Sequence, residues 1–130
     1  MAADEAEPKP VRWVGSSRDD VREFPESVRL RVGGALWEAQ LGRKAGWAKP
    51  LKGFGGAGVL EVVDDFDGDT FRAVYTVRFA GAVYVLHAFQ KKSKSGIATP
   101  HHEIALIEQR LKRAKEDYDR WMTGAKTKSR

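Results

Sequence analysis

The stretch TFRAVYTVRFAGAVYVLHAFQ, residues 70–90, decides the fold because it predicts two adjacent β-strands. Residues 70–80 alternate, so that one face of the strand is apolar and the other is polar. The apolar set is Phe71, Ala73, Tyr75, Val77 and Phe79, and the polar set is Arg72, Thr76 and Arg78. Residues 82–90 are apolar on both faces, which is typical of a central strand. Gly81 allows a tight turn, so the two strands should be antiparallel neighbours.

The segments before this stretch add strands and helices to the prediction. Residues 58–63 form a short apolar strand, and a hairpin turn at Asp67-Gly68 joins it to the next strand, which gives a three-stranded antiparallel meander. Further upstream we expect a strand at residues 9–14, a short helix from Ser17 with a capping-box spacing, and a helix over residues 26–40. Residues 42–58 are rich in glycine and lysine and should form a loop.

The segment after the meander completes a small α+β domain. Thr99 and Pro100 are typical of a helix start, and apolar residues then recur at helical spacing as far as Trp121. We therefore predict a small antiparallel sheet with two N-terminal helices packed on one face, and a C-terminal helix. Residues 1–8 should form a disordered tail, residues 9–122 one domain, and residues 123–130 a frayed basic tail.

Composition excludes several classes of protein. The chain has no cysteine, which rules out disulfides, thiolate catalysis and cysteine-based zinc sites. The N-terminus is acidic and polar, unlike a signal peptide, and the apolar runs are too short to span a bilayer. We expect a cytoplasmic protein with no membrane partner.

The charge distribution favours a polyanionic partner. Lysine and arginine number 23 against 18 acids. Residues 43–52 carry four bases and no acid, residues 61–69 carry five acids and no base, and residues 91–94 carry three lysines. This segregation predicts a polar surface with a positive side.

The usual catalytic and metal motifs are missing. The sequence contains no G-x-S-x-G and no phosphate-binding G-x-x-x-x-G-K-[ST] motif. His101 and His102 are adjacent and should point apart, and His87, in an apolar strand, is more typical of a hydrogen-bonded core residue. The acids at residues 64–69 lack the downstream glutamate of a calcium loop. No metal or other cofactor is expected.

Basic residues near the strands are therefore the candidate site. Arg72 stands out because an arginine inside a mostly apolar strand needs a phosphate or a carboxylate. A solvated charged surface is the alternative that explains most such clusters. The remaining candidates lie before, within and after the meander: Lys49, Lys52, Arg78, Lys91, Lys92 and Lys94.

Four segments together resemble the RelE/ParE toxin superfamily of type II toxin–antitoxin systems, and most closely its phage-derived HigB-like branch. They are KPLKGFG (49–55), DTFRAVY (69–75), VYVLHAFQKK (83–92) and the Thr99-Pro100 helix start. The family's strand arginine falls on Arg72 and its F-x-K-K ending on residues 89–92, whereas Phe71 replaces the tyrosine often found before the arginine. The resemblance implies a RelE-like fold with two N-terminal helices on an antiparallel sheet.

The same resemblance implies an activity and a set of partners. The activity is that of a metal-independent endoribonuclease, an mRNA interferase that cleaves messenger RNA on the ribosome. A helix-turn-helix antitoxin of the HigA kind would neutralise it, and operator DNA would be bound through the toxin–antitoxin complex. On this interpretation Arg72 clamps the phosphate, Lys91 or Lys92 supplies charge and acid–base catalysis, and the other four bases bind RNA. Two alternatives remain: a ParE-like inhibitor of DNA gyrase without catalysis, and a degenerate member that only binds its partner or operator DNA.

Overall fold

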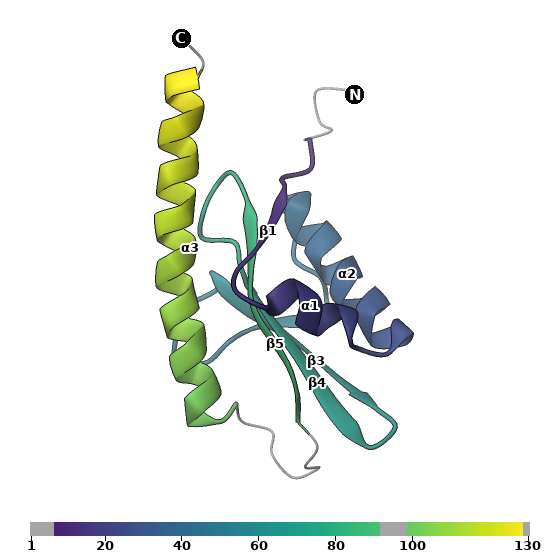
Figure 1. Ribbon diagram of the computed structural model, residues 1–130. Coiled ribbons are helices and arrows are strands. Elements are labelled where there is room, and N and C mark those ends of the chain that lie inside the picture. Colours follow the sequence, from purple (N-terminus) through teal and green to yellow (C-terminus); the bar gives the residue numbers. More distant parts are fainter. Residues whose placement is uncertain (1–6, 92–98, 129–130) are drawn as a thin grey trace.

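A computed structural model describes residues 7–91 and 99–128, with side chains as far as residue 124 (Figure 1). It confirms the α+β class: a five-stranded sheet, two N-terminal helices and a C-terminal helix. In chain order the elements are β1 (Val11–Trp13), α1 (Ser17–Arg22), α2 (Glu26–Gln40), β2 (Ala48–Pro50), β3 (Val59–Phe66), β4 (Asp69–Thr76), β5 (Val83–Lys91) and α3 (His101–Lys128).

The sheet has the strand order β1-β5-β4-β3-β2. The predicted meander of β3, β4 and β5 is antiparallel, as expected. β1 pairs in parallel with β5, an arrangement that the strand pattern alone did not specify. β2 lies inside the segment that was expected to be a loop, where only Ala48–Pro50 pair with β3. Three residues that include a proline show no alternation, and proline is tolerated there because β2 is at the edge of the sheet.

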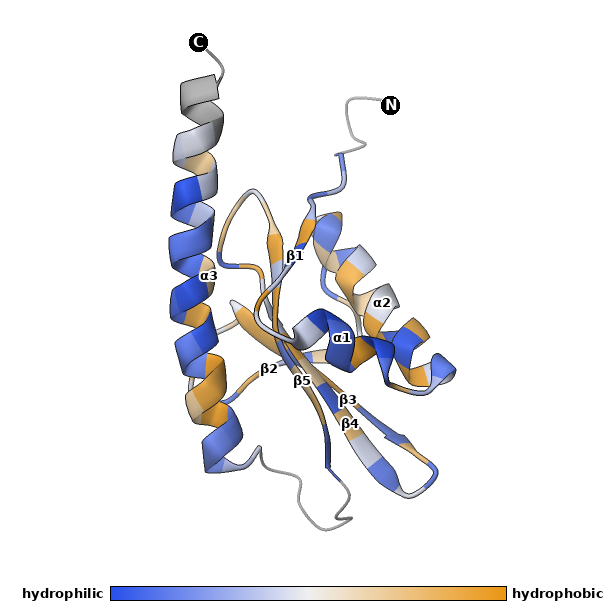
Figure 2. Ribbon diagram, viewed as in Figure 1, coloured by the Kyte–Doolittle hydropathy of each residue, from blue (hydrophilic) through white to orange (hydrophobic). Residues whose placement is uncertain are grey.

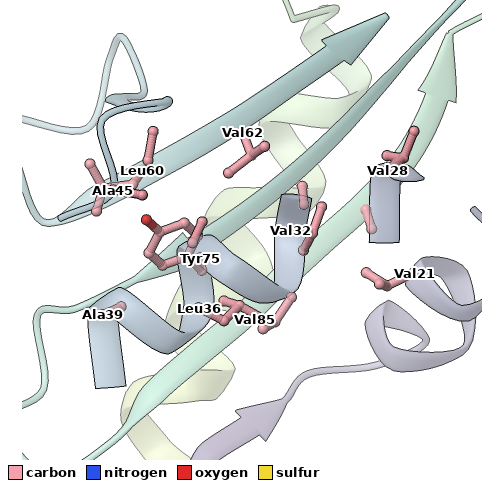
Figure 3. Close-up of a cluster of buried hydrophobic side chains, with 14 of the residues drawn as sticks. Val21, Val28, Val32, Leu36, Ala39, Ala45, Leu60, Val62, Tyr75 and Val85 are labelled. Atoms are coloured by element: carbon pink, nitrogen blue, oxygen red, sulfur yellow. The ribbon is translucent and has the colours of Figure 1, made fainter. Parts of the chain in front are cut away.

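The helices cover both faces of the sheet (Figure 1). On one face α2 presents Val28, Val32, Leu36 and Ala39 to Leu60, Val62, Tyr75 and Val85 (Figure 3). On the other face α3 packs Ile107 and Ala114 against Val74, Tyr84 and Leu86. Figure 2 shows that the β3–β4 hairpin becomes hydrophilic toward its turn, beyond these two cores. Val74 lies in the α3 core, and Arg72 and Thr76 share its face of β4. The face of β4 that was predicted to be polar therefore points toward α3 and not toward open solvent.

A β-bulge in β5 decides which residues face α3. Val74 pairs with His87 and Tyr75 pairs with Val85, so Leu86 is an extra residue in β5. With strict alternation His87 would share the α2 side with Val85. The bulge instead turns His87 to the side of Val74, toward α3.

Two element ends differ from the sequence prediction. β4 ends at Thr76 and not near residue 80, and the Thr76 hydroxyl donates to the Gly58 carbonyl at 2.6 Å. Phe79 then packs against Tyr84 and Tyr118 on the α3 side, opposite the face of Phe71. α3 extends to Lys128, beyond the residues that the apolar spacing covers. No helix in the described part of the chain is both long and apolar enough to cross a membrane.

Candidate functional site

A cavity of about 490 Å³ lies on the α3 side of the sheet, between β3, β4, the segment after β2 and the start of α3. Its walls include one acidic and one basic side chain, those of Glu61 and Arg72, and strands β3 and β4 fix their positions. Its lining residues are Leu51, Lys52, Gly53, Glu61, Arg72, Thr99 and Ile104. The cavity thus collects charged residues from three separate segments of the chain.

Arg72 is the central cation of this cavity. Its guanidinium Nη1 donates to Glu61 Oε1 and to Thr99 Oγ1, each at 3.2 Å. The residue is only 3% exposed, which corrects the expectation that it lies on an open polar strand face. The reason is that Thr99, just before α3, and Ile104, in the first turn of α3, lie over that face of the sheet. An arginine this deeply buried needs partners, and the carboxylate of Glu61 is one of them.

Glu61 is the functional candidate that the sequence did not single out. It was one of five acids in residues 61–69, a run that was interpreted only as part of the segregated surface charge. In the structure its side chain is 15% exposed and lies beside Arg72. The alternation of side chains along β3 could have identified Glu61, because Val59 and Glu61 must share one face of the strand and Val59 is buried. A carboxylate held at a cavity wall can accept a proton from a bound hydroxyl group.

Two of the predicted lysines adjoin the cavity from the β2 side. Lys52 lines it and is exposed. Lys49 is the direct cross-strand partner of Glu61, so the two side chains share a face with Cβ atoms roughly 5 Å apart. Both lysines can contribute positive potential to an anion entering the cavity.

Lys91 lies on the same face as Arg72, at the end of β5. Phe89 pairs with Arg72 and Lys91 pairs with Thr70, which puts Lys91 two residues farther along the strand. Lys92 and Lys94 were also predicted to be site residues, but they lie outside the described residues.

Arg78 does not line this cavity. Its guanidinium donates to the Phe54 carbonyl and borders a second hollow of about 470 Å³ beside α3. The two hollows adjoin, because Gly53 lines both. The residues around Arg78 include Phe54, Glu108, Leu111 and Lys112. The structure therefore separates Arg78 from Arg72, although both were expected on one strand face.

His87 belongs to a hydrogen-bond network between β5 and α3. Its Nε2 lies 2.6 Å from Glu103 Oε1, and its Nδ1 lies 3.2 Å from Arg110 Nη1. Arginine can only donate, so Nδ1 accepts from Arg110, and Nε2 carries the ring hydrogen and donates it in a hydrogen bond to Glu103 Oε1. The Arg110 guanidinium also donates to the Leu86 carbonyl at 3.0 Å, and burial lowers its pKa. This is the hydrogen-bonded core histidine that the sequence suggested.

A second polar cluster fastens β1 to α3. Arg12 Nε donates to Asp117 Oδ2 at 2.9 Å, and the Tyr84 hydroxyl donates to the same oxygen at 2.6 Å. These two hydrogen bonds hold the pKa of the Asp117 carboxyl below its usual value, and the bond to Asp117 raises the pKa of Arg12. Arg12 also lies over the Trp121 ring, 4.9 Å from its centroid. This cluster ties the ends of the chain together and lies away from the cavity.

The chemistry available at the cavity is that of an arginine, a carboxylate and nearby lysines. The arginine can bind an anion, the carboxylate can accept a proton, and the lysines add positive charge. Within residues 7–91 and 99–128, no group of three or more histidine, aspartate or glutamate side chains is placed to hold a metal ion.

Comparison with known proteins gives one family and one solved structure. The model of the family described as "Phage derived protein Gp49-like" matches residues 19–112. The solved structure is that of the toxin–antitoxin complex RelBE2 from Mycobacterium tuberculosis. It is similar to the chain with 21% sequence identity and a TM-score of 0.42, covering 69% of this chain and 99% of that one. No curated protein matches the chain.

Proposed function

Because this chain belongs to the phage-derived Gp49-like family, we propose that it is the toxin of a type II toxin–antitoxin system and cleaves messenger RNA on the ribosome. The observation that carries the proposal is the pair of Arg72 and Glu61 in the wall of one cavity, with Lys49 and Lys52 beside it. The pair offers a cation for a phosphate and a base for a hydroxyl group within one site.

The proposed reaction is an attack of the RNA 2′-OH on the neighbouring phosphorus. Glu61 accepts the proton of the 2′-OH as the bond from O2′ to phosphorus forms. Arg72 binds two phosphate oxygens as negative charge builds on them. The bond from phosphorus to O5′ then breaks, leaving a 2′,3′-cyclic phosphate and a 5′-OH. Lys91 or Lys92 supplies the proton that O5′ takes up.

Thr99 is the partner of Arg72 that a phosphate would replace. Arg72 donates to both residues with a charged guanidinium, but Thr99 offers a neutral hydroxyl, whereas the Glu61 carboxylate adds the attraction between opposite charges. A phosphate oxygen in the place of Thr99 Oγ1 would restore a charged acceptor. Arg72 could then bind RNA while it stays beside Glu61.

The partners follow from the same proposal. RNA contacts would come from Lys49, Lys52, Lys94 and, in the neighbouring hollow, Arg78. A helix-turn-helix antitoxin of the HigA kind would neutralise the chain and carry it to operator DNA. The ribosome would position the messenger, which compensates for a small domain that has few groups of its own to orient RNA. The site of action would be the cytoplasm, and residues 9–122 would form the toxin domain.

A ribosome assay tests the proposal directly. The chain is added to ribosomes translating a defined messenger, and the 3′ ends of the fragments are mapped. We expect cleavage by the parent chain and by Arg22→Ala, which changes an exposed arginine of α1, and none by Arg72→Ala or Glu61→Gln. Intact messenger together with inhibited DNA supercoiling by gyrase would favour the ParE-like alternative. Neither activity, with binding to the antitoxin retained, would favour a degenerate member.

A further inference from the structure

α2 is apolar on two opposite sides, and only one of them packs against the sheet. Val28, Val32, Ala35 and Ala39 face the core and are almost fully buried. Leu30 and Trp37, seven residues apart and therefore on one side of the helix, point outward. Leu30 is 68% exposed and Trp37 is 48% exposed. Covering them would remove apolar area from water, so this surface is suited to a partner.

The surface between Leu30 and Trp37 is open at Gly33 and covered by Trp47 at Gly34. Gly33 and Gly34 fill that part of the helix, and a Cβ built on Gly33 would meet open space. Trp47 packs beside Gly34 and donates its indole N–H to the Arg31 carbonyl at 2.9 Å. We name the surface made by Leu30, Gly33, Gly34, Trp37 and Trp47 the α2 outer face. Glycines let another backbone approach closely, and exposed tryptophans are typical anchors of protein interfaces.

The charges beside this face define the partner further. Arg29 and Arg31 are exposed and lie on opposite flanks of the apolar stripe. The Arg31 guanidinium lies over the Trp47 ring, 5.4 Å from its centroid. Glu38, the acid nearest Trp37, already accepts from Arg43 at 2.7 Å. The two flanks are therefore positive, whereas the N-terminal end of the stripe carries the exposed Glu26, one turn before Leu30.

We propose that the α2 outer face binds an amphipathic helix of a partner protein, with apolar residues at i, i+3 or i+4, and i+7 and acidic residues on both flanks. The apolar spacing matches Leu30 and Trp37, the acids match Arg29 and Arg31, and Gly33 allows close contact between the helices. This face lies on the opposite side of the sheet from the cavity. The proposal therefore stands apart from the proposed function, and binding there leaves the cavity open.

The test uses the full chain and a synthetic helical peptide. The peptide carries leucines at i, i+4 and i+7, glutamates on both flanks and a hydrocarbon staple on its far side, and binding is followed by fluorescence anisotropy. We expect micromolar binding, at least about tenfold weaker for Leu30→Ala/Trp37→Ala. Phe66→Ala, which removes an exposed aromatic ring elsewhere, should bind like the parent. Arg29→Glu/Arg31→Glu should prefer a peptide with lysine flanks.

Thermal melts of all variants show whether they are folded, and each contrary result overturns the proposal. One is absence of peptide binding by the folded parent. Another is binding that the Leu30/Trp37 and arginine variants leave unchanged. Binding of a single-stranded RNA oligomer that Trp37→Ala abolishes would make the face an RNA surface instead. A dimer in analytical ultracentrifugation that Trp37→Ala dissociates would make it an interface between two copies.

Discussion

Replacing Arg72 with alanine should weaken the fold and stop RNA cleavage, and these two effects can be measured separately. The change removes a guanidinium that is 3% exposed and leaves the Glu61 carboxylate, 15% exposed, without that donor. Breaking a fully buried pair costs about 3–5 kcal/mol. Here the adjoining cavity of about 490 Å³ gives water access to the carboxylate, so we expect about 2 kcal/mol. For 130 residues this corresponds to a fall in Tm of roughly 7 °C.

The double variant Arg72→Ala/Glu61→Ala separates stability from catalysis. It also removes the Glu61 carboxylate, which has lost its ion-pair partner in the single variant. The double variant should therefore regain part of the lost stability, with a coupling energy between Arg72 and Glu61 of about 1 kcal/mol. Cleavage should not return, because loss of a transition-state donor costs about 2.7–4 kcal/mol, or on the order of a hundredfold to a thousandfold in rate. Calorimetry and the ribosome assay measure the two quantities on the same samples.

Two results would refute this reasoning. An Arg72→Ala variant that melts like the parent would mean that the pair adds nothing to the free energy of unfolding. A double variant that regains both stability and cleavage would mean that Arg72 acts through the fold alone. Arg72→Lys is the intermediate control: it keeps the charge but loses the fork that binds two oxygens, so it should melt close to the parent and cleave only partly.

Three further perturbations test other parts of the structure. Gly15→Ala should lower Tm more than Gly42→Ala, because both residues have positive φ but only a Cβ at Gly15 would meet a guanidinium, at 2.9 Å; equal melts would contradict this close approach. Asp117→Asn should cost up to about 1 kcal/mol at pH 7. The pKa of the folded Asp117 is lowered, so its stabilisation is present above about pH 4 and is lost as the pH falls through that lowered pKa; calorimetry should therefore show a smaller difference between variant and parent at low pH than at pH 7. Lys49→Ala/Lys52→Ala should flatten the log–log salt dependence of binding to single-stranded RNA by roughly 0.7 for each phosphate that the variant no longer binds, and an unchanged slope would remove both lysines from the RNA surface.

The strands and helices with a clear period could be predicted from the sequence. β4 follows from its alternation, β5 from the apolar run after Gly81, and α3 from a capped helical repeat. β2 could not be predicted, because three residues ending in a proline have no period, and their pairing with β3 depends on the tertiary structure. The parallel pairing of β1 with β5 likewise depends on where α1 and α2 carry the chain.

The candidate site was predictable in residue type but not in environment. Arg72 stood out because an arginine is unusual in an apolar strand, yet its alternation with Phe71 suggested solvent on its side of the sheet. α3 occupies that side, and no local pattern in β4 reports where a helix some thirty residues later will pack. Glu61 was missed for the same reason, because its proposed role depends on the ion pair with Arg72 on the neighbouring strand.

The bond between Arg12 and Asp117 joins residues 105 positions apart in the chain, and this has a consequence for how the protein folds. α1 packs on β5, and within the described part of the chain β1 pairs only with β5, so the N-terminal elements have no sheet to dock on while they are being made. Such non-local pairings slow folding and leave apolar surface open to aggregation in the meantime. The lining of the cavity is completed last, because Thr99 and Ile104 follow all five strands in the chain and are synthesised after them. A nascent chain therefore lacks a finished site until α3 has been synthesised.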